Sequence, residues 1–534
     1  MKGLAILLIV LCQSISFSQL GFDHYFNYKT IDTNNISAEF TNYGNLVPLA
    51  TWNQIQGQDL SIVYDEGPWI IGKLNGIPAA SINEWFTLYS PGPIINGEAG
   101  ILAQPEDSLT FRVYKISRGD DNSNPDYAEW PDTLGAPVDQ NGDPLLYGDQ
   151  TLWTVYNGVD STLSSRNQYG EYYPPLPVEI RQTVFSHAGN YADTANIFSN
   201  VLFIEWTIIN KGSAPIDSAY FALWSDIDFD GAIRNRPAVD SSTQLAYLWG
   251  DTAYYIDTNP AVGFQLLYGP AAASSGDTAI FKGRQLPGYK NLPMTSYHGI
   301  SDDAALDPLT GSIRSVSDAW NAARGFDLDG NVIINPVTNE PTKFTFSGDP
   351  VTQEGWLFPR NWSGGGAGFV FFSGPFNFAP QDTQWAMAAL VPGLGGSYIS
   401  SIVNMRQKVD ILRSIPYDSL AWGNPFYGIT SVKGITDDQV PERFELQQNY
   451  PNPFNPATTI KYSIPSGISN NGASLVTLKV YDILGRETAT LVNEKKTAGE
   501  YEINFDASKL ASGVYFYQLR AGSFTQTRKM VLLR

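Results

Sequence analysis

The chain of 534 residues carries 33 basic and 53 acidic side chains, which gives a formal net charge of −20. Such an acidic protein is repelled by nucleic acid and by anionic membrane surfaces, so we expect no nucleic-acid partner. Only 16% of the residues are charged and 13% are aromatic, while Gly and Pro number 48 and 34. This composition favours short strands joined by tight turns over long helices.

The first eighteen residues have the order of a secretory signal peptide. Lys2 precedes an apolar run at 4–11, and Ser16 and Ser18 lie three and one residues before a cleavage point expected after Ser18. The run is too short to span a bilayer, and no later stretch reaches about eighteen consecutive apolar residues, so no transmembrane segment is expected. The alternative to a signal peptide is that the apolar run at 4–11 forms a buried first strand. Cys12 is the only cysteine, so neither disulfides nor thiol chemistry are expected in the mature chain.

The region after the signal peptide has the pattern of a large β-sandwich body. Apolar or alternating runs typical of strands occupy 109–116, 201–209, 219–224, 368–372 and 384–391. Two segments, 316–323 and 397–414, have helical spacing instead. A body of this length predicts two lobes, 19–175 and 176–430, divided at the proline-rich stretch 172–177.

A polar linker is predicted at 431–443, and strand-like runs are more closely spaced after it. Residues 444–534 hold further strand-like runs in a short space, at 458–463, 474–482, 499–505, 513–521 and 523–533. That density predicts a small Ig-like β-sandwich. The fold class expected for the whole chain is therefore all-β, with a large sandwich body followed by a small C-terminal one.

Three motifs mark this last segment. They read Asn-Tyr-Pro-Asn-Pro-Phe-Asn-Pro at 449–456, Val-Tyr-Asp-Ile-Leu-Gly-Arg at 480–486, and Leu-Ala-Ser-Gly-Val-Tyr-Phe-Tyr at 510–517 with a basic close at 528–530. Together they closely resemble the type A sorting domain of the type IX secretion system. The positions that carry the resemblance are Tyr450, Pro451, Asn452, Pro453, Phe454, Gly485, Arg486, Gly513, Tyr515 and Lys529.

The resemblance implies delivery through the periplasm to the outer cell surface or the extracellular space. The partners it implies are the type IX translocon and its sortase-like protease, with attachment to surface lipopolysaccharide or polysaccharide, or release. The body is similar to uncharacterised surface proteins of the Bacteroidota and Ignavibacteria type that carry this domain, on motifs at 69–76, 148–157 and 346–350. That similarity implies a shared architecture and no known activity.

The prolines of the opening motif also predict local structure. Pro451, Pro453 and Pro456 fix φ and lack an amide donor, so 450–456 is expected to be an extended edge outside any strand ladder. Phe454 is then expected to plug the end of the sandwich. The alternative is that 444–534 is only a structural Ig-like module, because a fold does not by itself give a function.

Acidic turns in the body predict bound calcium. Alternate carboxylates followed by Gly231 form the first half of an oxygen-rich calcium loop, although Pro237 stands where the closing Glu is expected. A second, shorter copy precedes Gly330, and 139–143 is shorter still. The candidate ligands are Asp226, Asp228, Asp230, with Asp240 closing the first site, and Asp327 and Asp329 in the second. The alternative is that each is a plain turn.

Catalytic motifs are sparse in the body, and we expect no catalytic residue. The three histidines, His24, His187 and His298, are scattered singly. Glycoside hydrolysis needs only two carboxylates, and three glutamates lie near tryptophans, namely Glu84, Glu205 and Glu354. The sequence therefore predicts an exported structural or adhesive protein with polysaccharide as a candidate ligand. The alternative is a secreted carbohydrate-active hydrolase that uses a carboxylate pair.

Overall fold

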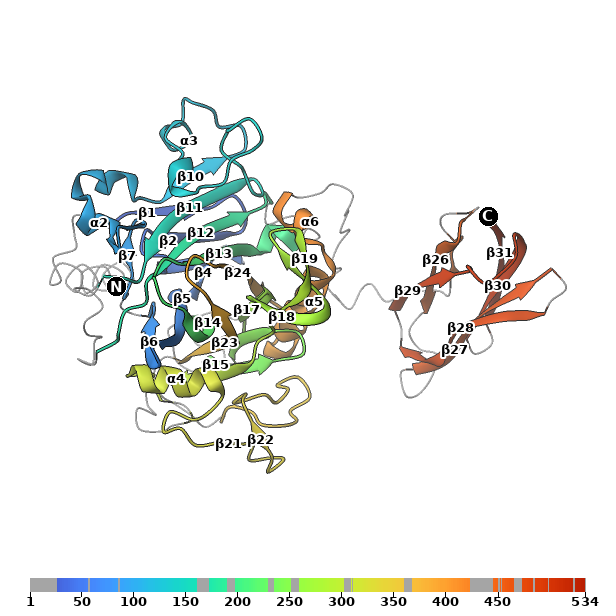
Figure 1. The fold of residues 1–534 in the computed structure, drawn as a ribbon. Helices are drawn as coiled ribbons and strands as arrows, with labels where there is room; N and C mark the ends of the chain where they lie inside the picture. Colours follow the sequence, from blue (N-terminus) through green and yellow to red (C-terminus); the bar gives the residue numbers. More distant parts are fainter. Residues whose placement is uncertain are drawn as a thin grey trace. The chain divides into compact units, whose positions relative to one another are not determined.

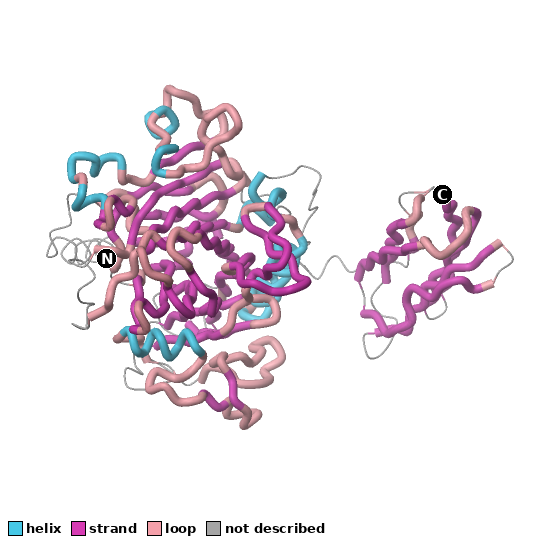
Figure 2. The backbone as a smooth tube through the Cα atoms, viewed as in Figure 1, coloured by secondary structure: helices cyan, strands magenta, loops and turns pink. Residues whose placement is uncertain are grey.

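The computed structural model describes residues 26–55, 58–84, 87–160, 172–189, 197–228, 235–250, 259–301, 309, 311–359, 367–422, 445–449, 452, 454–464, 473–483, 486–497, 499–521 and 524–533. The chain divides into two compact units, Met1–Val432 and Lys433–Arg534. Each is described by itself (Figure 1). Strands dominate both units (Figure 2), which confirms the all-β class. The predicted signal peptide lies outside the described residues.

The first unit is built on two sheets. The first sheet has the order β1-β2-β3-β5-β14-β23-β20, with β4 and β6 attached to β3 and β5. Its strands are β1 (Tyr28–Ile31), β2 (Ile36–Thr41), β3 (Leu46–Ile55), β4 (Gln58–Val63), β5 (Asp65–Leu74), β6 (Ile77–Ser81), β14 (Ile216–Asp226), β20 (Ser296–Ser301) and β23 (Ala367–Phe378).

The second sheet has the order β10-β11-β12-β13-β24-β17-β16-β15, with β7 attached to β11. Its strands are β7 (Ser90–Pro91), β10 (Tyr114–Ser117), β11 (Gln150–Asn157), β12 (Val178–Ser186), β13 (Leu202–Asn210), β15 (Asn235–Asp240), β16 (Leu245–Gly250), β17 (Ala261–Tyr268) and β24 (Thr383–Gly393). Each sheet combines strands from both sides of residue 175, so the structure corrects the predicted division into lobes 19–175 and 176–430. Length alone suggested two lobes, but strands distant in sequence pair within one sandwich.

Side-chain alternation along the strands places the core between the sheets. On β13, Ile204 and Trp206 join the cluster shared by both sheets, whereas Phe203 belongs to a second cluster on the outer face. Helix α4 (Val316–Arg324) covers the outer face of the first sheet, and α5 (Tyr398–Ser414) and α6 (Tyr417–Trp422) cover that of the second. The body is therefore a sandwich with helices on both outer faces.

Both predicted helices are confirmed, and local signals explain why. Ser315 and Ser397 each accept a hydrogen bond from the backbone N–H three residues on, which satisfies an otherwise unpaired donor of the first turn. Gly325, with φ of 80°, ends α4 in the left-handed conformation that suits glycine. Local capping signals therefore mark where both helices begin.

The predicted strand at 109–116 is wrong in its first half. Pro105–Thr110 forms the 3₁₀ helix η1, with Pro at its start and two acidic residues in its first turn. The other strand predictions for the body coincide, to within one residue at the start of β13, with parts of β13, β14, β23 and β24. The remaining small elements are β8 (Ile94–Ile95), β9 (Glu98–Ala99), α2 (Gly100–Ala103), α3 (Pro125–Ala128), η2 (Asp132–Leu134), η3 (Ile197–Asn200), β21 (Ile333–Ile334) and β22 (Pro341–Thr342).

One hairpin stands apart from both sheets of the body. Its strands, β18 (Ala271–Phe281) and β19 (Arg284–Asn291), pair only with each other. Lys282 and Gly283, with φ of 47° and 77°, form the two-residue turn between them. Most of the hairpin is exposed, but both ends of β18 pack on the body. Its last residues do so through Ile280 and Phe281. At its start, the Gln384 side chain accepts from the Ala271 N–H and donates to the Ala271 carbonyl, and Ala272 packs on the main core.

The second unit is a small sandwich of two facing sheets with one core cluster. The sheets have the orders β25-β26-β29 and β28-β27-β30-β31. Their strands are β25 (Glu445–Leu446), β26 (Ala457–Ile464), β27 (Ala473–Asp482), β28 (Glu487–Thr497), β29 (Gly499–Asp506), β30 (Gly513–Ala521) and β31 (Phe524–Leu532). All the strands predicted here are present, and β25 and β28 are additions. In the part of the chain that the structure describes, no helix is long and apolar enough to cross a membrane.

Candidate functional site

The opening motif of the second unit lies along the free edge of the last strand, β31. The side-chain oxygen of Asn452 accepts a hydrogen bond from the Val531 N–H at 2.9 Å. The Phe454 N–H donates to the Val531 carbonyl, and the Leu533 N–H donates to the Phe454 carbonyl, both at 2.9 Å. Phe454 thus forms a parallel bridge with Leu532, which corrects the expectation that 450–456 makes no ladder contact. A non-proline residue between prolines keeps its own N–H donor.

Phe454 is also part of the core of this unit. Its side chain is 2% exposed, and its ring centre lies 6.3 Å from that of Phe505. Burying an aromatic side chain in this way removes a large apolar area from water. Three other motif positions, Tyr450, Pro451 and Pro453, lie outside the described residues. The part of the motif that is described therefore joins the core to the edge of β31.

The middle motif forms the turn between β27 and β28. The Arg486 N–H and its guanidinium Nε both donate to the carboxylate of Asp482, at 2.9 and 2.7 Å. Arg486 itself is exposed, so we expect this ion pair to add little to stability. Gly485 lies outside the described residues.

The closing motif supplies β30 and β31. Gly513 begins β30 opposite Leu532, and the Tyr515 hydroxyl donates to the Ala511 carbonyl at 2.8 Å. The Lys529 carbonyl accepts from the side-chain amides of Gln448 at 2.8 Å and of Asn452 at 3.4 Å. The Lys529 side chain is exposed, so here its backbone joins the two ends of the unit.

The candidate calcium ligands of the first loop are not all brought together. Asp226 ends β14 directly opposite Asp65 of β5, and Asp230 lies outside the described residues. Asp240 ends β15, five residues beyond Asn235, so a strand of this length separates the two by about 16 Å. Its carboxylate caps the next turn by accepting from the Ser242 N–H at 3.0 Å. Asp240 is therefore at the opposite end of β15 from the loop that it was expected to close.

The second acidic loop closes on its own groups. The two carboxylate oxygens of Asp327 accept from the Asn331 N–H at 2.7 Å and from its side-chain amide at 3.2 Å. Gly330 takes a φ of 88° in the same turn, and Asp329 is exposed. Among the described residues, no group of three or more His, Cys, Asp or Glu side chains is placed to hold a metal ion.

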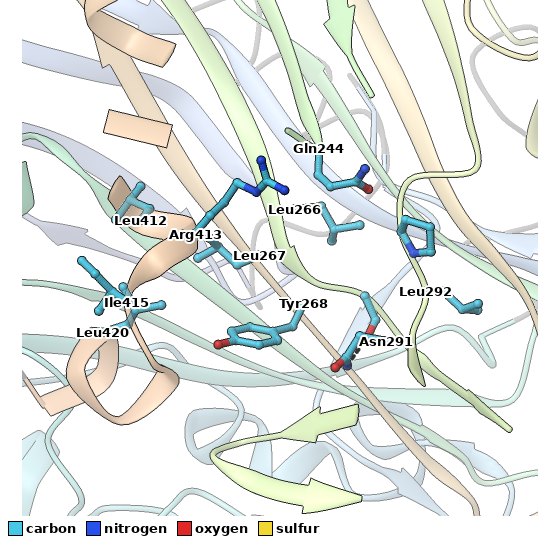
Figure 3. A pocket seen from close by; sticks show the side chains of 12 residues that line it. Gln244, Leu266, Leu267, Tyr268, Asn291, Leu292, Leu412, Arg413, Ile415 and Leu420 are labelled. Atoms are coloured by element: carbon cyan, nitrogen blue, oxygen red, sulfur yellow. Dashed lines mark hydrogen bonds between the residues drawn. The ribbon is translucent and has the colours of Figure 1, made fainter. Parts of the chain in front are cut away.

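A pocket of about 250 Å³ opens on the body, where the end of β17 meets the base of the hairpin and the C-terminal end of α5 (Figure 3). Leu266, Leu412 and Leu420 contribute apolar walls. Tyr268 lies across the pocket floor in the close-up, and its ring stacks on Trp385 with centres 5.2 Å apart. The pocket is large enough for a single small ligand and offers it an aromatic face.

The amides of the pocket hold its walls in place. The side chain of Asn291 donates to the carbonyls of Gly269 and Ile280, both at 2.9 Å, and that of Gln244 accepts from the Met294 N–H. Arg413, exposed in the last turn of α5, supplies the one charged side chain among the residues described at the pocket. These groups can bind and orient a ligand, but they supply no carboxylate or imidazole for acid–base chemistry.

The three glutamates near tryptophans lie in different parts of the body. Glu84 follows β6 and is 3% exposed, and burial raises its pKa to about 8. Glu205 is buried on the outer face of the second sheet, where burial raises its pKa and nearby Lys282 partly offsets the rise. Glu354 lies in an exposed turn. The structure does not bring these glutamates together as a pair.

The pocket residues were not singled out from the sequence. They come from four separate segments, near 244, at 266–269, at 291–293 and at 412–420. No local motif links these segments, because only the packing of α5 and the hairpin on the second sheet makes them neighbours. Tyr268 could have been noticed only as an aromatic residue at the end of a strand.

The comparisons with known proteins bear on the second unit first. Residues 448–533 match the family described as the secretion system C-terminal sorting domain. This unit is a type IX sorting domain. The protein is therefore exported to the cell surface or the extracellular space through the type IX secretion machinery, with which the sorting domain interacts.

Solved structures give only distant likenesses. A polysaccharide lyase aligns with 95% of this chain and 46% of its own at 8% identity and a TM-score of 0.26. The adhesin domain of Epf from Streptococcus pyogenes aligns with 72% of this chain and 90% of its own at 8% identity and a TM-score of 0.13. PorZ, a surface component of the type IX secretion system of Porphyromonas gingivalis, aligns with 75% of this chain and 46% of its own at 9% identity and a TM-score of 0.14.

The chain thus spans about half the length of the lyase and of PorZ. TM-scores this low do not establish a shared fold. No curated protein matches the chain. What the body does has to be argued from its own residues.

Proposed function

We propose that the sorting domain delivers a non-catalytic body that binds polysaccharide at the cell surface or outside the cell. The observation that carries the proposal is the lining of the pocket, which combines an aromatic face, apolar walls and one guanidinium. Sites of this composition hold a ligand by shape and by a few polar contacts. The net charge of −20 favours neutral over acidic glycans, because like charges repel.

Affinity electrophoresis of the purified mature chain tests this proposal. The protein is run through gels that contain starch, laminarin, mannan or xylan, and we expect at least one of them to retard it. Tyr268→Ala removes the aromatic floor and should weaken the retardation roughly tenfold, the loss of about 1.4 kcal/mol expected for one aromatic contact. Tyr28→Ala, at a 48% exposed tyrosine of β1, is the matched control. Equal retardation of all three proteins would remove the pocket from the proposal.

A second candidate function is a carbohydrate-active hydrolase. Glu84 favours it, because a pKa of about 8 keeps a carboxylic acid protonated near neutral pH, as a general acid requires. A hydrolase also needs a second carboxylate facing the first across a cleft. Reducing sugar released from the same polysaccharides by the wild type, and lost in Glu84→Gln, would establish hydrolysis and end the non-catalytic proposal.

Calcium binding at the loop after β14 stays a proposal. Asp226 and Asp65 are opposite each other on neighbouring strands. Burial and the nearby Asp226 raise the pKa of Asp65 well above its usual range, and a bound cation would offset both effects. Melting curves recorded with millimolar calcium and with a chelator test whether this loop binds calcium. We expect the chelator to lower the melting temperature, and Asp226→Asn should abolish the difference. Identical curves would end the calcium proposal.

We further propose that the exported protein is anchored to surface lipopolysaccharide. The support is the presence of the sorting domain alone. In a host that has the type IX machinery, the anchored protein should migrate on gels as a heterogeneous species of increased mass in the outer-membrane fraction. A single sharp band confined to the medium would show release instead.

A further inference from the structure

The larger sheet of the sorting domain, β28-β27-β30-β31, has one face in the core and one face outside it. Core residues alternate along its strands, as Leu478 does on β27, Tyr517 on β30 and Met530 on β31. Successive side chains of a strand point to opposite faces, so the residues between them form the outer face. We call this surface the basic face. Its members on β27, β30 and β31 are Thr477, Lys479, Tyr481, Phe516, Gln518, Arg520, Thr525, Thr527 and Lys529.

The pairing of the strands arranges these side chains in rows. The rows are Tyr481, Phe516 and Lys529; Lys479, Gln518 and Thr527; and Thr477, Arg520 and Thr525. The Gln518 side-chain amide donates to Thr527 Oγ1 at 2.9 Å. Arg520 Nε donates to Thr525 Oγ1 at 3.5 Å. One row thus supplies two neighbouring aromatic rings and a cation, and the other two supply cations, hydroxyls and an amide.

Positive charge is in excess on the basic face. Glu487 of β28 pairs with Lys479 at 2.8 Å. Arg520 and Lys529 are exposed, and neither forms an ion pair with another described residue. The hydrogen bond from Glu487 raises the pKa of Lys479, whereas the nearby Arg520 acts to lower it. An anion bound on this face would offset the repulsion between the two cations.

The described part of the opposite sheet has a balanced outer face. There Lys461 of β26 pairs with Glu502 of β29 at 3.0 Å. The sequence shows a similar contrast on a larger scale. Residues 444–534 hold 10 basic and 7 acidic side chains, whereas the rest of the chain holds 23 and 46. The sorting domain is therefore the basic part of an acidic protein, and one of its faces has unpaired cations that suit an anionic partner.

The spacing of the cations favours a polymer over a small anion. Lys479 and Arg520 are diagonal neighbours on adjacent strands, about 7–8 Å apart. Lys529 lies four residues beyond the position opposite Arg520, which is about 14 Å along the strand. One carboxylate or phosphate cannot reach all three cations, but a linear chain with repeated negative charges can.

The groups between the cations favour sugar as the repeating unit. Tyr481 and Phe516 are half-buried, so part of each ring remains open to an apolar ring face. The hydroxyls of Thr525 and Thr527 are on exposed residues and can donate to or accept from the hydroxyls of a sugar. Charge, ring faces and hydroxyls therefore occur together on one surface.

We propose that the basic face of the sorting domain binds a linear acidic polysaccharide. Lys479, Arg520 and Lys529 pair with its carboxylates, and the Arg520 guanidinium can hold one of them through two parallel hydrogen bonds. The sugar rings pack on Tyr481 and Phe516. This ligand is opposite in character to the neutral glycan proposed for the body, and its site is on the other unit. The sorting domain would thus be held at a surface by charge, without a covalent bond.

Retention of the purified mature chain on immobilised polygalacturonate tests this proposal. We expect the wild type to bind at low salt and to elute as the salt concentration rises, because salt screens contacts between exposed charges. It should not bind to dextran, a neutral polymer. Arg520→Gln with Lys529→Gln should weaken binding roughly tenfold, because two exposed charge contacts are lost. Lys529→Gln alone should show a smaller loss in the same direction, and it serves as the test if the double variant does not fold.

A matched control removes the same charge elsewhere in the sorting domain. Lys461→Gln with Lys509→Gln changes two exposed lysines outside the basic face, and it should bind as the wild type does. An equal loss in this control would show that only net charge matters, which overturns the proposal. Melting curves of all the variants verify that they are folded.

Other occupants of the basic face give different results. A wild type that polygalacturonate does not retain overturns the proposal, and so does tighter binding to immobilised oligothymidine, which would assign the face to nucleic acid. A dimer in gel filtration that is lost in the double variant, without retention on the acidic polymer, would assign the face to a second copy. Tyr268→Ala, in the pocket of the body, should be retained as the wild type is. Failure of the acidic ligand therefore leaves the proposed function of the body standing.

Discussion

The two units of this protein use buried polar groups in opposite ways. Among the described residues of the sorting domain, the buried polar side chains are Asn449, Thr458 and Ser463, all uncharged. The body, by contrast, buries ionisable groups, among them Glu66 and Lys408. Burying a charge is costly unless it is paired or neutralised. The sorting domain is thus organised for a stable fold, whereas the body contains groups whose cost suggests another purpose.

Removing the core aromatic of the sorting motif gives the largest expected effect. Phe454→Ala should lower the free energy of unfolding of the sorting domain by about 4 kcal/mol, the usual cost of truncating a buried Phe. Export should then fail, because the domain loses both a core residue and its hold on β31. Chemical denaturation and surface labelling of cells measure the two effects. Normal export of a variant with an unfolded sorting domain would show that the folded edge is not what the machinery needs.

The pH dependence of the free energy of unfolding tests whether the buried acids destabilise the body. The pKa of Glu84 is raised to about 8 in the folded state, so the fold binds this proton more tightly than the unfolded chain does. Stability due to this group should fall as pH rises from about 4.5, the unfolded value, to about 8. Glu84→Gln should therefore stabilise the body by about 3 kcal/mol at pH 7 and by almost nothing at pH 4. Denaturation curves at the two pH values measure this, and an equal change at both would contradict it.

The edge hydrogen bonds of the motif predict a smaller effect. Asn452→Ala removes the bond to the Val531 N–H and the weaker bond to the Lys529 carbonyl. We expect a loss of about 1–2 kcal/mol in the stability of the sorting domain, because a donor at the edge of β31 is left to water. Amide hydrogen exchange at Val531 should accelerate at the same time. Unchanged exchange at this amide would argue that the segment does not protect the edge in solution.

The exposed ion pair of the middle motif gives the smallest effect. Arg486→Ala breaks its contact with Asp482, and a pair this exposed contributes about 0.5 kcal/mol or less. The melting temperature should hardly change. Reduced export of a variant with normal stability would then assign Arg486 to recognition by the translocon and separate it from the structural residues of the motif.

Much of the secondary structure could be predicted because its signals are local. Ser315 and Ser397 predict the starts of their helices from residues within one turn. The apolar runs of β13 and β24 likewise predict strands. The pairing of β13 with β24 could not be predicted, since it joins residues about 180 positions apart in the sequence. The division near residue 175 failed for this reason.

The functional sites also differ in how far they could be predicted from the sequence. The sorting motif could be recognised because it resembles a known family, although the contact of Asn452 with β31 spans 79 positions of the sequence. The closing role expected of Asp240 failed, because β15 carries it away from its loop. Glu205 was singled out because Trp206 follows it in the sequence. The Trp206 side chain, however, faces the inner core. The real neighbours of Glu205, namely Trp385 and Tyr417, come from segments that the sequence gives no reason to join.

The contact between the opening motif and β31 also sets when the sorting domain can complete its folding. The edge of β31 is contacted by Leu446, Asn452 and Phe454, so the first and last segments of the sorting domain complete each other. This domain can finish folding only after Leu532 has been synthesised, when the body ahead of it is already available to fold. A chain that stops short of β31 exposes an unpaired strand edge, which favours aggregation. The last strand thus completes the fold of the sorting domain.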